Sequence, residues 1–237
     1  AMPGWKAKQL CPHIIFVPPR FDAYKKASQQ IREIFRRYTD IIEPLSLDEA
    51  FLDVTVNKKS ENIATALALE LKDTIYKETD LTCSAGVSYC KFLAKVASDI
   101  NKPNGITIIK PHQAESFIAA LPVEKFFGVG KVTARKMKSM GIHKGEDLLM
   151  YSKIELAQKF GKSGQFFFNI VRGIDNRPVE SNSVRKSLAV ERTLEQDLSD
   201  IEEISIVLEK VIDMFYRRLQ KADNFGRTIS LKLKTHD

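Results

Sequence analysis

Apolar residues along this chain recur in two spacings, one typical of helices and one typical of strands. Helices are predicted where apolar side chains return every three or four positions, and strands where short β-branched or aromatic runs end at Gly or Pro. In the first half the predicted helices cover about 5–11, 22–38 (with Asp22 as its cap), 61–78, 91–100 and 111–121. The predicted strands there cover 14–17, two runs on either side of 46–50, 81–87 and 106–109. The order strand, strand, helix, strand predicts an antiparallel α+β layer.

The pattern changes at Pro122, where the predicted helices become short and are separated by glycines. Residues 122–180 carry eleven Lys and Arg against six Asp and Glu, a net charge of +5. One glycine turn, 128–131, opens a helix that runs to about Met140, and a second basic turn lies at 160–164. Most of the excess positive charge of the chain therefore lies in this quarter of its length.

The last part of the chain begins with a polar stretch, 180–185, that is typical of a linker. A strand at 186–192, an amphipathic helix at 201–219 and a strand at 228–234 are predicted after it. The helix is expected to bury one apolar face, made of Ile204, Val207, Leu208, Val211, Ile212, Phe215 and Leu219. Because the last strand stops without a partner and the first residue is Ala1, we expect the chain to be a fragment cut at both ends.

Composition excludes several classes of protein. The 237 residues are 43% hydrophobic and 28% charged, which is ordinary for a soluble globular protein. The formal charge of +7 is compatible with a polyanionic partner. No apolar run approaches the ~20 residues of a membrane span. The three cysteines form no Cys-x-x-Cys pair, so we expect reduced thiols inside a cell, and the scattered histidines offer no metal or nucleophile spacing.

Asp48 and Glu49 are neighbouring acids between two apolar, strand-like runs. At a turn between strands both carboxylates can point to one place, and together they suit a hard cation such as Mg²⁺ that takes its other ligands from water and substrate phosphates. Their mutual repulsion also favours a cation. The alternative is that both acids are solvated turn residues.

Gly128, Val129, Gly130 and Lys131 form the second candidate site. Glycines let backbone N–H groups converge, and the following helix presents its positive end, a combination that holds a phosphate. In a short helical setting this is the helix-hairpin-helix way of gripping a nucleic-acid backbone, and the alternative is a plain turn between helices.

Three further residues are candidates of lower specificity. Lys162 and Gly164 belong to the second basic turn. Lys102 lies in the tight turn 101–105 and would matter only where the fold brings it toward Asp48, since it could then neutralise phosphate oxygens.

The motifs occur in an order that resembles a Y-family translesion DNA polymerase over essentially the whole chain. They are Ser-Leu-Asp-Glu-Ala-Phe-Leu-Asp-Val-Thr at 46–55, Ser-Ala-Gly-Val at 84–87, Lys-Phe-Leu-Ala-Lys at 91–95, Asn-Lys-Pro-Asn-Gly at 101–105 and Gly-Val-Gly-Lys at 128–131. The resemblance implies an α+β fold with an antiparallel palm sheet. It implies a palm with a remnant of the fingers at 1–121, a helical thumb with a helix-hairpin-helix at 122–180, a linker at 181–186 and an incomplete α/β little finger at 187–237.

The resemblance also implies an activity and its residues. Asp48 and Glu49 would be catalytic and bind two Mg²⁺ ions, while Lys102 would contact the incoming triphosphate. Gly128, Val129, Gly130, Lys131, Lys162 and Gly164 would bind DNA. The primer 3′-hydroxyl would attack the α-phosphate of a deoxynucleotide during error-prone synthesis in DNA repair and damage tolerance.

The implied setting is the bacterial cytoplasm, with action on the chromosome. The implied partners are primer–template DNA, deoxynucleoside triphosphates and a sliding clamp bound through a C-terminal segment outside this chain. A monomer without membrane contact is expected.

The chain departs from the family pattern in two respects. The family places another metal-binding aspartate and an aromatic steric gate in a first strand, and the finger residues on the triphosphate, before the point where this chain starts. We therefore expect the chain alone to lack polymerase activity. Phe127 stands where a proline is usual before the Gly-x-Gly.

Two alternatives to a polymerase stay open at this point. One is a non-catalytic module that binds a DNA backbone. The other is a different palm-type enzyme, such as a nucleotidyl cyclase. The basic region after the palm argues against the cyclase, which needs no grip on a duplex.

Overall fold

The computed structural model describes residues 2–182, 186–194, 196–223 and 225–234. The chain divides into two compact units, Ala1–Asn182 and Ser183–Asp237, and each is described by itself below. Among the described residues, no helix has both the length and the apolar character that a membrane span needs.

The predicted helices of the first half are confirmed, with ends that differ by a few residues. They are α1 (Gly4–Leu10), α2 (Phe21–Arg36), α3 (Ala64–Thr79), α4 (Lys91–Ile100) and α5 (Pro111–Ala120). Helices α2 and α3 pack through a small core of Ile34, Tyr38, Leu67 and Ile75. The assignment of Asp22 as the cap is wrong: Arg20 is the N-cap, and Asp22 lies in the first turn, where its charge still suits the positive helix end.

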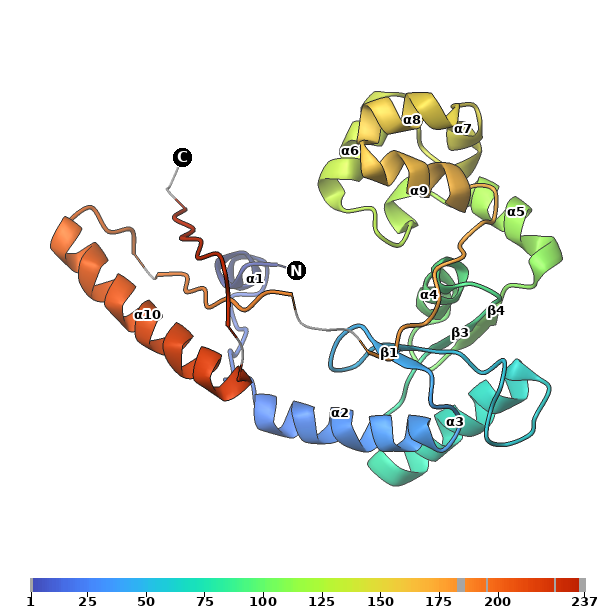
Figure 1. Ribbon diagram of the computed structural model, residues 1–237, viewed down its shortest axis with the longest axis horizontal. Coiled ribbons are helices and arrows are strands. Elements are labelled where there is room, and N and C mark those ends of the chain that lie inside the picture. Colours follow the sequence, from blue (N-terminus) through green and yellow to red (C-terminus); the bar gives the residue numbers. More distant parts are fainter. Residues whose placement is uncertain (1, 183–185, 195, 224, 235–237) are drawn as a thin grey trace. The chain divides into compact units, whose positions relative to one another are not determined.

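The strands form two separate pairs. Strands β1 (Ile42–Pro44) and β2 (Ala50–Leu52) are antiparallel, with Glu43 opposite Phe51. Strands β3 (Ala85–Val87) and β4 (Ile106–Ile108) are parallel. The expectation of an antiparallel layer is therefore correct for the first pair and wrong for the second. Helix α4 joins β3 to β4 and returns the chain to the end from which β3 started, so both strands run the same way (Figure 1).

The strand predicted at 14–17 is wrong. No strand is assigned there among the described residues, and Ile15 and Val17 are 84% and 78% exposed. A strand needs a neighbouring backbone with which to form its ladder, and Pro18 and Pro19 remove two of the N–H donors on one side. An apolar run by itself does not supply that partner.

Four short helices gather after Pro122 (Figure 1). They are α6 (Lys131–Ser139), α7 (Gly145–Leu149), α8 (Lys153–Phe160) and α9 (Lys162–Ile170). Their buried residues belong to the same core as those of α4 and α5, including Phe92, Leu93, Ile118, Met137, Leu148, Leu156 and Phe167. One continuous apolar core therefore holds these helices against α4 and α5.

The second unit contains α10 (Ile201–Ala222), capped by the Asp200 side chain, which accepts from the backbone N–H groups of Glu202 and Glu203. The predicted apolar face is half-buried along its length, except for Ile212, which is 53% exposed.

The strands predicted at 186–192 and 228–234 are wrong, because neither described segment is assigned as a strand. The two segments do meet, through an ion pair of 2.9 Å between Lys232 and Glu191. A contact between side chains does not make a ladder, and two strands without a third are marginal in water. Part of the predicted linker, residues 183–185, lies outside the described residues.

Candidate functional site

Asp48 and Glu49 lie at the tip of the β1–β2 hairpin. The backbone N–H groups of Leu45 and Ser46 donate to the Glu49 carbonyl oxygen, at 2.9 and 3.2 Å, and close the loop. The Ser46 hydroxyl donates to Asp48 Oδ1 at 2.6 Å and accepts from the Asp48 N–H at 3.3 Å. We call β1, the loop 45–49 and β2 the carboxylate hairpin, because it presents both exposed acids at one end.

Helix α4 and the turn after it place opposite charges beside this tip. Lys95 Nζ lies 3.4 Å from Glu49 Oε1 and 3.0 Å from Asp99 Oδ2. Lys102 Nζ lies 2.5 Å from Asp99 Oδ1. The fold thus brings Lys102 to the predicted acids, and Asp99 links it to Lys95.

The ionisation of these groups reflects their proximity. The pKa of Lys102 is raised, first by its hydrogen bond to Asp99 and further by the charges of Asp99, Glu49 and Asp48, against a smaller opposing effect of burial. Burial would raise the pKa of Asp99, but hydrogen bonds from Lys102 and Lys95 outweigh it and lower the pKa.

Sequence reasoning missed Lys95 and Asp99. The signal was present as a polar stripe, because residues 95, 99 and 102 follow one another at steps of four and three and so share one side of the helical path. Only the packing of α4 beside the hairpin shows which residues that stripe faces.

The donors at the hairpin tip fit part of a metal site. Two carboxylates are exposed on adjacent residues of the hairpin tip, and two ammonium groups nearby offset some of their repulsion. In the described part of the chain, no three His, Cys, Asp or Glu side chains form a group that could hold a metal ion. Asp48 and Glu49 would thus supply only part of a coordination shell for a hard cation such as Mg²⁺, which usually keeps waters and substrate phosphates as its other ligands.

The glycine turn 128–131 begins α6 as expected. Gly128 has a φ of +93°, a conformation that side-chain-bearing residues rarely adopt. Gly130 is the N-cap, and Lys131 is the first residue of the helix and is exposed.

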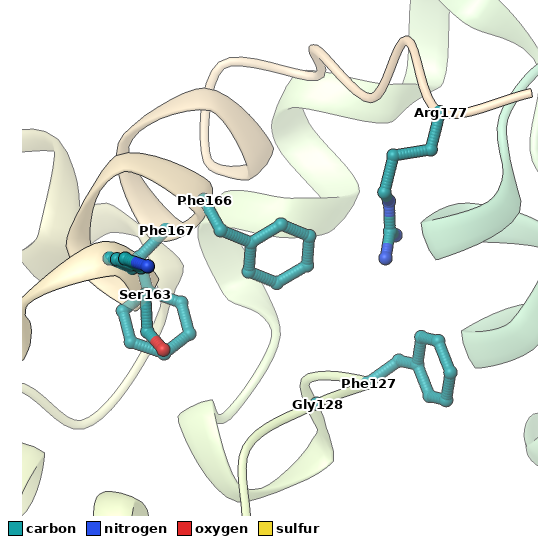
Figure 2. Close-up of a pocket in the computed structure, with 7 residues that line it drawn as sticks. Phe127, Gly128, Ser163, Phe166, Phe167 and Arg177 are labelled. Atoms are coloured by element: carbon teal, nitrogen blue, oxygen red, sulfur yellow. The ribbon is translucent and has the colours of Figure 1, made fainter. Parts of the chain in front are cut away.

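The second basic turn lies beside the first one. Lys162 begins α9 directly after Gly161, whose φ is +59°. A cavity of about 270 Å³ is lined by residues of both turns, Gly128 on one side and Lys162 and Ser163 on the other. Figure 2 shows this cavity between the rings of Phe127 and Phe166 and the side chain of Arg177. The two turns predicted as separate candidates therefore share one surface.

Gly164 has a different part. It is buried, and a Cβ added to it would lie 2.0 Å from the carbonyl oxygen of Leu156 in α8. The absence of a side chain lets α9 approach α8, and the contact of Gly164 with DNA stays a prediction.

The segment after α9 returns across the base of this surface. The buried carboxylate of Asp175 accepts from the Phe92 N–H at 2.9 Å and from Arg177 Nε at 2.6 Å. Burial would raise its pKa, but the Arg177 and Phe92 hydrogen bonds lower it. The Arg177 guanidinium lies 4.7 Å from the centre of the Phe166 ring, which makes Arg177 a cavity residue that the sequence did not reveal.

Comparison with protein families assigns most of the chain. The impB/mucB/samB family matches residues 1–99, and the C-terminal domain of the same family matches 185–237. Between them, residues 124–175 match the thumb domain described for DNA polymerase-iota.

Curated relatives match the chain over its full length. DNA polymerase IV of Leptospira interrogans is 52% identical over 237 residues, covering 100% of this chain and 66% of the relative. DNA polymerase IV of Clostridioides difficile is 50% identical over 238 residues, covering 100% of this chain and 65% of the relative. The chain thus spans slightly less than two thirds of the length of these relatives.

Solved structures give the same result. A Y-family DNA polymerase chimera of Dbh and Dpo4 superposes with a TM-score of 0.80 at 34% identity, covering 92% of this chain and 63% of that one. An insertion ternary complex of Dbh DNA polymerase superposes with a TM-score of 0.70 at 33% identity, again covering 92% of this chain and 63% of the other.

Proposed function

This chain belongs to the impB/mucB/samB family of Y-family DNA polymerases, and from that premise we propose that it serves template-directed DNA synthesis of the translesion type. The reaction adds deoxynucleotides to a primer 3′ end during damage tolerance. The observation that carries the proposal is the hairpin tip, where Glu49 pairs with Lys95 and the charges of both acids act on Lys102, in the same compact unit as the glycine turn.

Each residue of the tip has a defined part in this proposal. Asp48 and Glu49 would hold Mg²⁺, in two ions that need one further aspartate from outside this chain. When bound, such ions supply Lewis-acid stabilisation of charge on the attacking and leaving oxygens. Lys102 neutralises the oxygens of the triphosphate, and Asp99 orients Lys102 through their 2.5 Å ion pair.

The basic helices grip the DNA backbone in this proposal. The turn 128–131 binds phosphates through the N–H groups of Gly128 and Gly130 and the ammonium of Lys131, while the Val129 N–H donates to the Phe126 carbonyl oxygen at 2.9 Å. Lys162 binds phosphates at the second turn. Such contacts position a duplex without reading its sequence.

The proposed division of the chain follows from these roles. Residues 1–121 form a palm, 122–180 a thumb, 181–186 a linker and 187–237 part of a little finger. Primer–template DNA, deoxynucleoside triphosphates and a sliding clamp are the proposed partners of a monomer that acts on the bacterial chromosome.

Primer extension tests the proposal. The chain alone is expected to give no product with Mg²⁺ and deoxynucleotides, because the carboxylate set is incomplete. A chimera that adds the preceding segment of the Leptospira interrogans relative before Ala1 is expected to extend a primer. In the chimera, Asp48→Ala or Glu49→Ala should lower turnover by roughly a hundredfold or more, because loss of even an outer partner of a metal ligand costs 10–100-fold.

Duplex affinity separates the outcomes. Both substitutions should leave it nearly unchanged, and Lys77→Ala on α3 serves as a distant control. Near-parental turnover of either carboxylate variant would remove that residue from the catalytic set. A chimera that binds duplex but never extends a primer would favour the non-catalytic DNA-binding module.

A further inference from the structure

Phe127 departs from the family pattern, and the structure shows where its side chain goes. Its ring packs edge-to-face against Phe51 of β2, with ring centres 6.2 Å apart and planes at 77°. Phe51 is 7% exposed and lies in β2, two positions after Glu49 at the tip of the carboxylate hairpin. The contact therefore joins the residue before the glycine turn to the strand that directly follows the two acids.

Phe51 is also held from the palm side. Lys91 Nζ lies 5.2 Å from the centre of the Phe51 ring and 2.5 Å from Glu43 Oε2, on the residue opposite Phe51 in the hairpin. Glu43 in turn accepts from the Glu180 N–H at 2.8 Å. Lys91 and Glu43 are mostly buried, with 10% and 19% of their side chains exposed, so this arrangement is well shielded from water.

The glycine turn needs such an anchor. Gly128 and Gly130 confer backbone freedom on either side of Val129, and a side chain added at Gly130 would meet nothing within 4 Å. Phe127 is the residue directly before this turn and is half-buried. A proline would fix its own φ but would offer no ring to the hairpin.

We propose that Phe127 is a positioning residue that fixes the DNA-gripping turn 128–131 relative to the carboxylate hairpin through its ring contact with Phe51. The proposal rests on the proposed function, because it concerns which nucleotides of the DNA held at the turn lie beside the acids at the hairpin tip. The contact sets where along the DNA the acids lie, rather than how tightly the DNA binds.

A tethered cleavage probe measures that register without requiring polymerase activity. Leu47 lies at the hairpin tip and is 37% exposed, so Leu47→Cys can carry an iron–EDTA group that cuts nearby DNA. The exposed Cys11 is changed to Ser. Burial raises the pKa of Cys83 and Cys90, which keeps both as unreactive thiols during labelling.

The probe-bearing chain is bound to a duplex with a recessed end, and the cut positions are mapped. The parent is expected to cut a narrow group of nucleotides. Phe127→Leu and Phe51→Leu should each broaden or shift that group, because each removes one ring of the contact. Phe51 does not line the cavity, so Phe51→Leu should change duplex affinity by less than about threefold. Phe127→Tyr should restore the parental pattern.

Phe168→Leu is the matched control, because it removes a ring from the same helices that packs on Arg172 and not on Phe51. A narrow, unshifted pattern in Phe127→Leu would overturn the inference while leaving the proposed function in place. A parent chain that does not bind duplex would overturn the proposed function and this inference with it. Duplex affinity, measured in parallel, tells the two results apart.

Discussion

The lysines at the hairpin tip have acidic partners, whereas Lys131 at the glycine turn has none among the residues that the structure describes. Lys95 and Lys102 pair with Glu49 and Asp99. Lys131 forms no ion pair with any residue that the structure describes, and it is exposed at the start of α6. An exposed cation at a positive helix end is free to bind an anion from outside the protein.

Changing Lys131 to Ala tests this at the residue scale. The variant should bind duplex DNA more weakly and about equally on all sequences, and the salt dependence of binding should fall by about one unit of slope. The measurement is a titration of a duplex with a recessed end at several salt concentrations. Lys77→Ala removes the same charge from α3 and should leave the slope unchanged. Equal slopes for parent and Lys131→Ala would move the phosphate grip to another loop.

At the scale of elements, the contact between α8 and α9 depends on a missing side chain. Gly164 faces Leu156 so closely that a methyl group would lie 2.0 Å from a backbone oxygen, which the rigid helix cannot move away. Helix α8 is itself well fixed, because Ser152 accepts from the Glu155 N–H and the Glu155 carboxylate accepts from the Ser152 N–H. The angle between these helices sets the position of Lys162 at the cavity.

Gly164→Ala should therefore lower the free energy of unfolding by about 1–3 kcal/mol, as overpacking does. Gly130→Ala is a suitable control, since its added methyl group meets nothing within 4 Å and its φ of −82° suits any residue. Chemical denaturation followed by circular dichroism measures both. Parental stability of Gly164→Ala would mean that the two helices separate without cost, and Lys162 would then have no fixed place.

At the scale of the whole first unit, the segment after α9 ties the helices α6–α9 to α4 and β1. Asp175 has 2% of its side chain exposed and binds both Arg177 and the Phe92 N–H at the start of α4. Further along, Lys91 donates to the Pro178 carbonyl oxygen at 3.0 Å, and the backbone N–H of Ile42 donates to Ser181 Oγ at 3.2 Å. A chain of polar contacts therefore runs from the end of α9 to β1.

The pH dependence of stability tests this connection. The folded state lowers the pKa of Asp175 below its unfolded value of about 3.9, so its contribution is present above that pH and is lost as pH falls through the folded value. Stability should therefore drop as the pH falls below about 4.

Asp175→Asn should cost about 1–3 kcal/mol at pH 7, where the charged hydrogen bonds are lost, and should flatten the acid limb. Denaturation at pH 7 and below pH 4 measures both effects. Asp73→Asn, at an exposed position of α3, should leave both unchanged. If the stability of Asp175→Asn fell below pH 4 as steeply as that of the parent, the acid sensitivity would belong to other carboxylates.

Local sequence determined the helices and the hairpin. The helix from Lys91 to Ile100 and the turns at Gly128 and Gly161 follow from side-chain spacing and from glycine's access to positive φ, and both signals act within a few residues. The same locality made Asp48 and Glu49 visible, because two adjacent acids at a strand turn need no distant partner to be noticed.

Strands and the shared site were decided by tertiary structure. The run at 14–17 has the composition of a strand, yet no strand forms there. Strands β3 and β4 pair in parallel because α4 carries the chain back between them. In both cases a strand forms only where a neighbouring backbone is present, and local sequence does not specify that neighbour. The approach of Lys95 and Asp99 to the hairpin and the contact of Phe127 with Phe51 likewise arise from packing. The sequence by itself determined which residues could take part in chemistry. The tertiary structure alone decided which of them lie close together, because the distance between segments far apart in the sequence is set by how the buried faces of helices and strands pack.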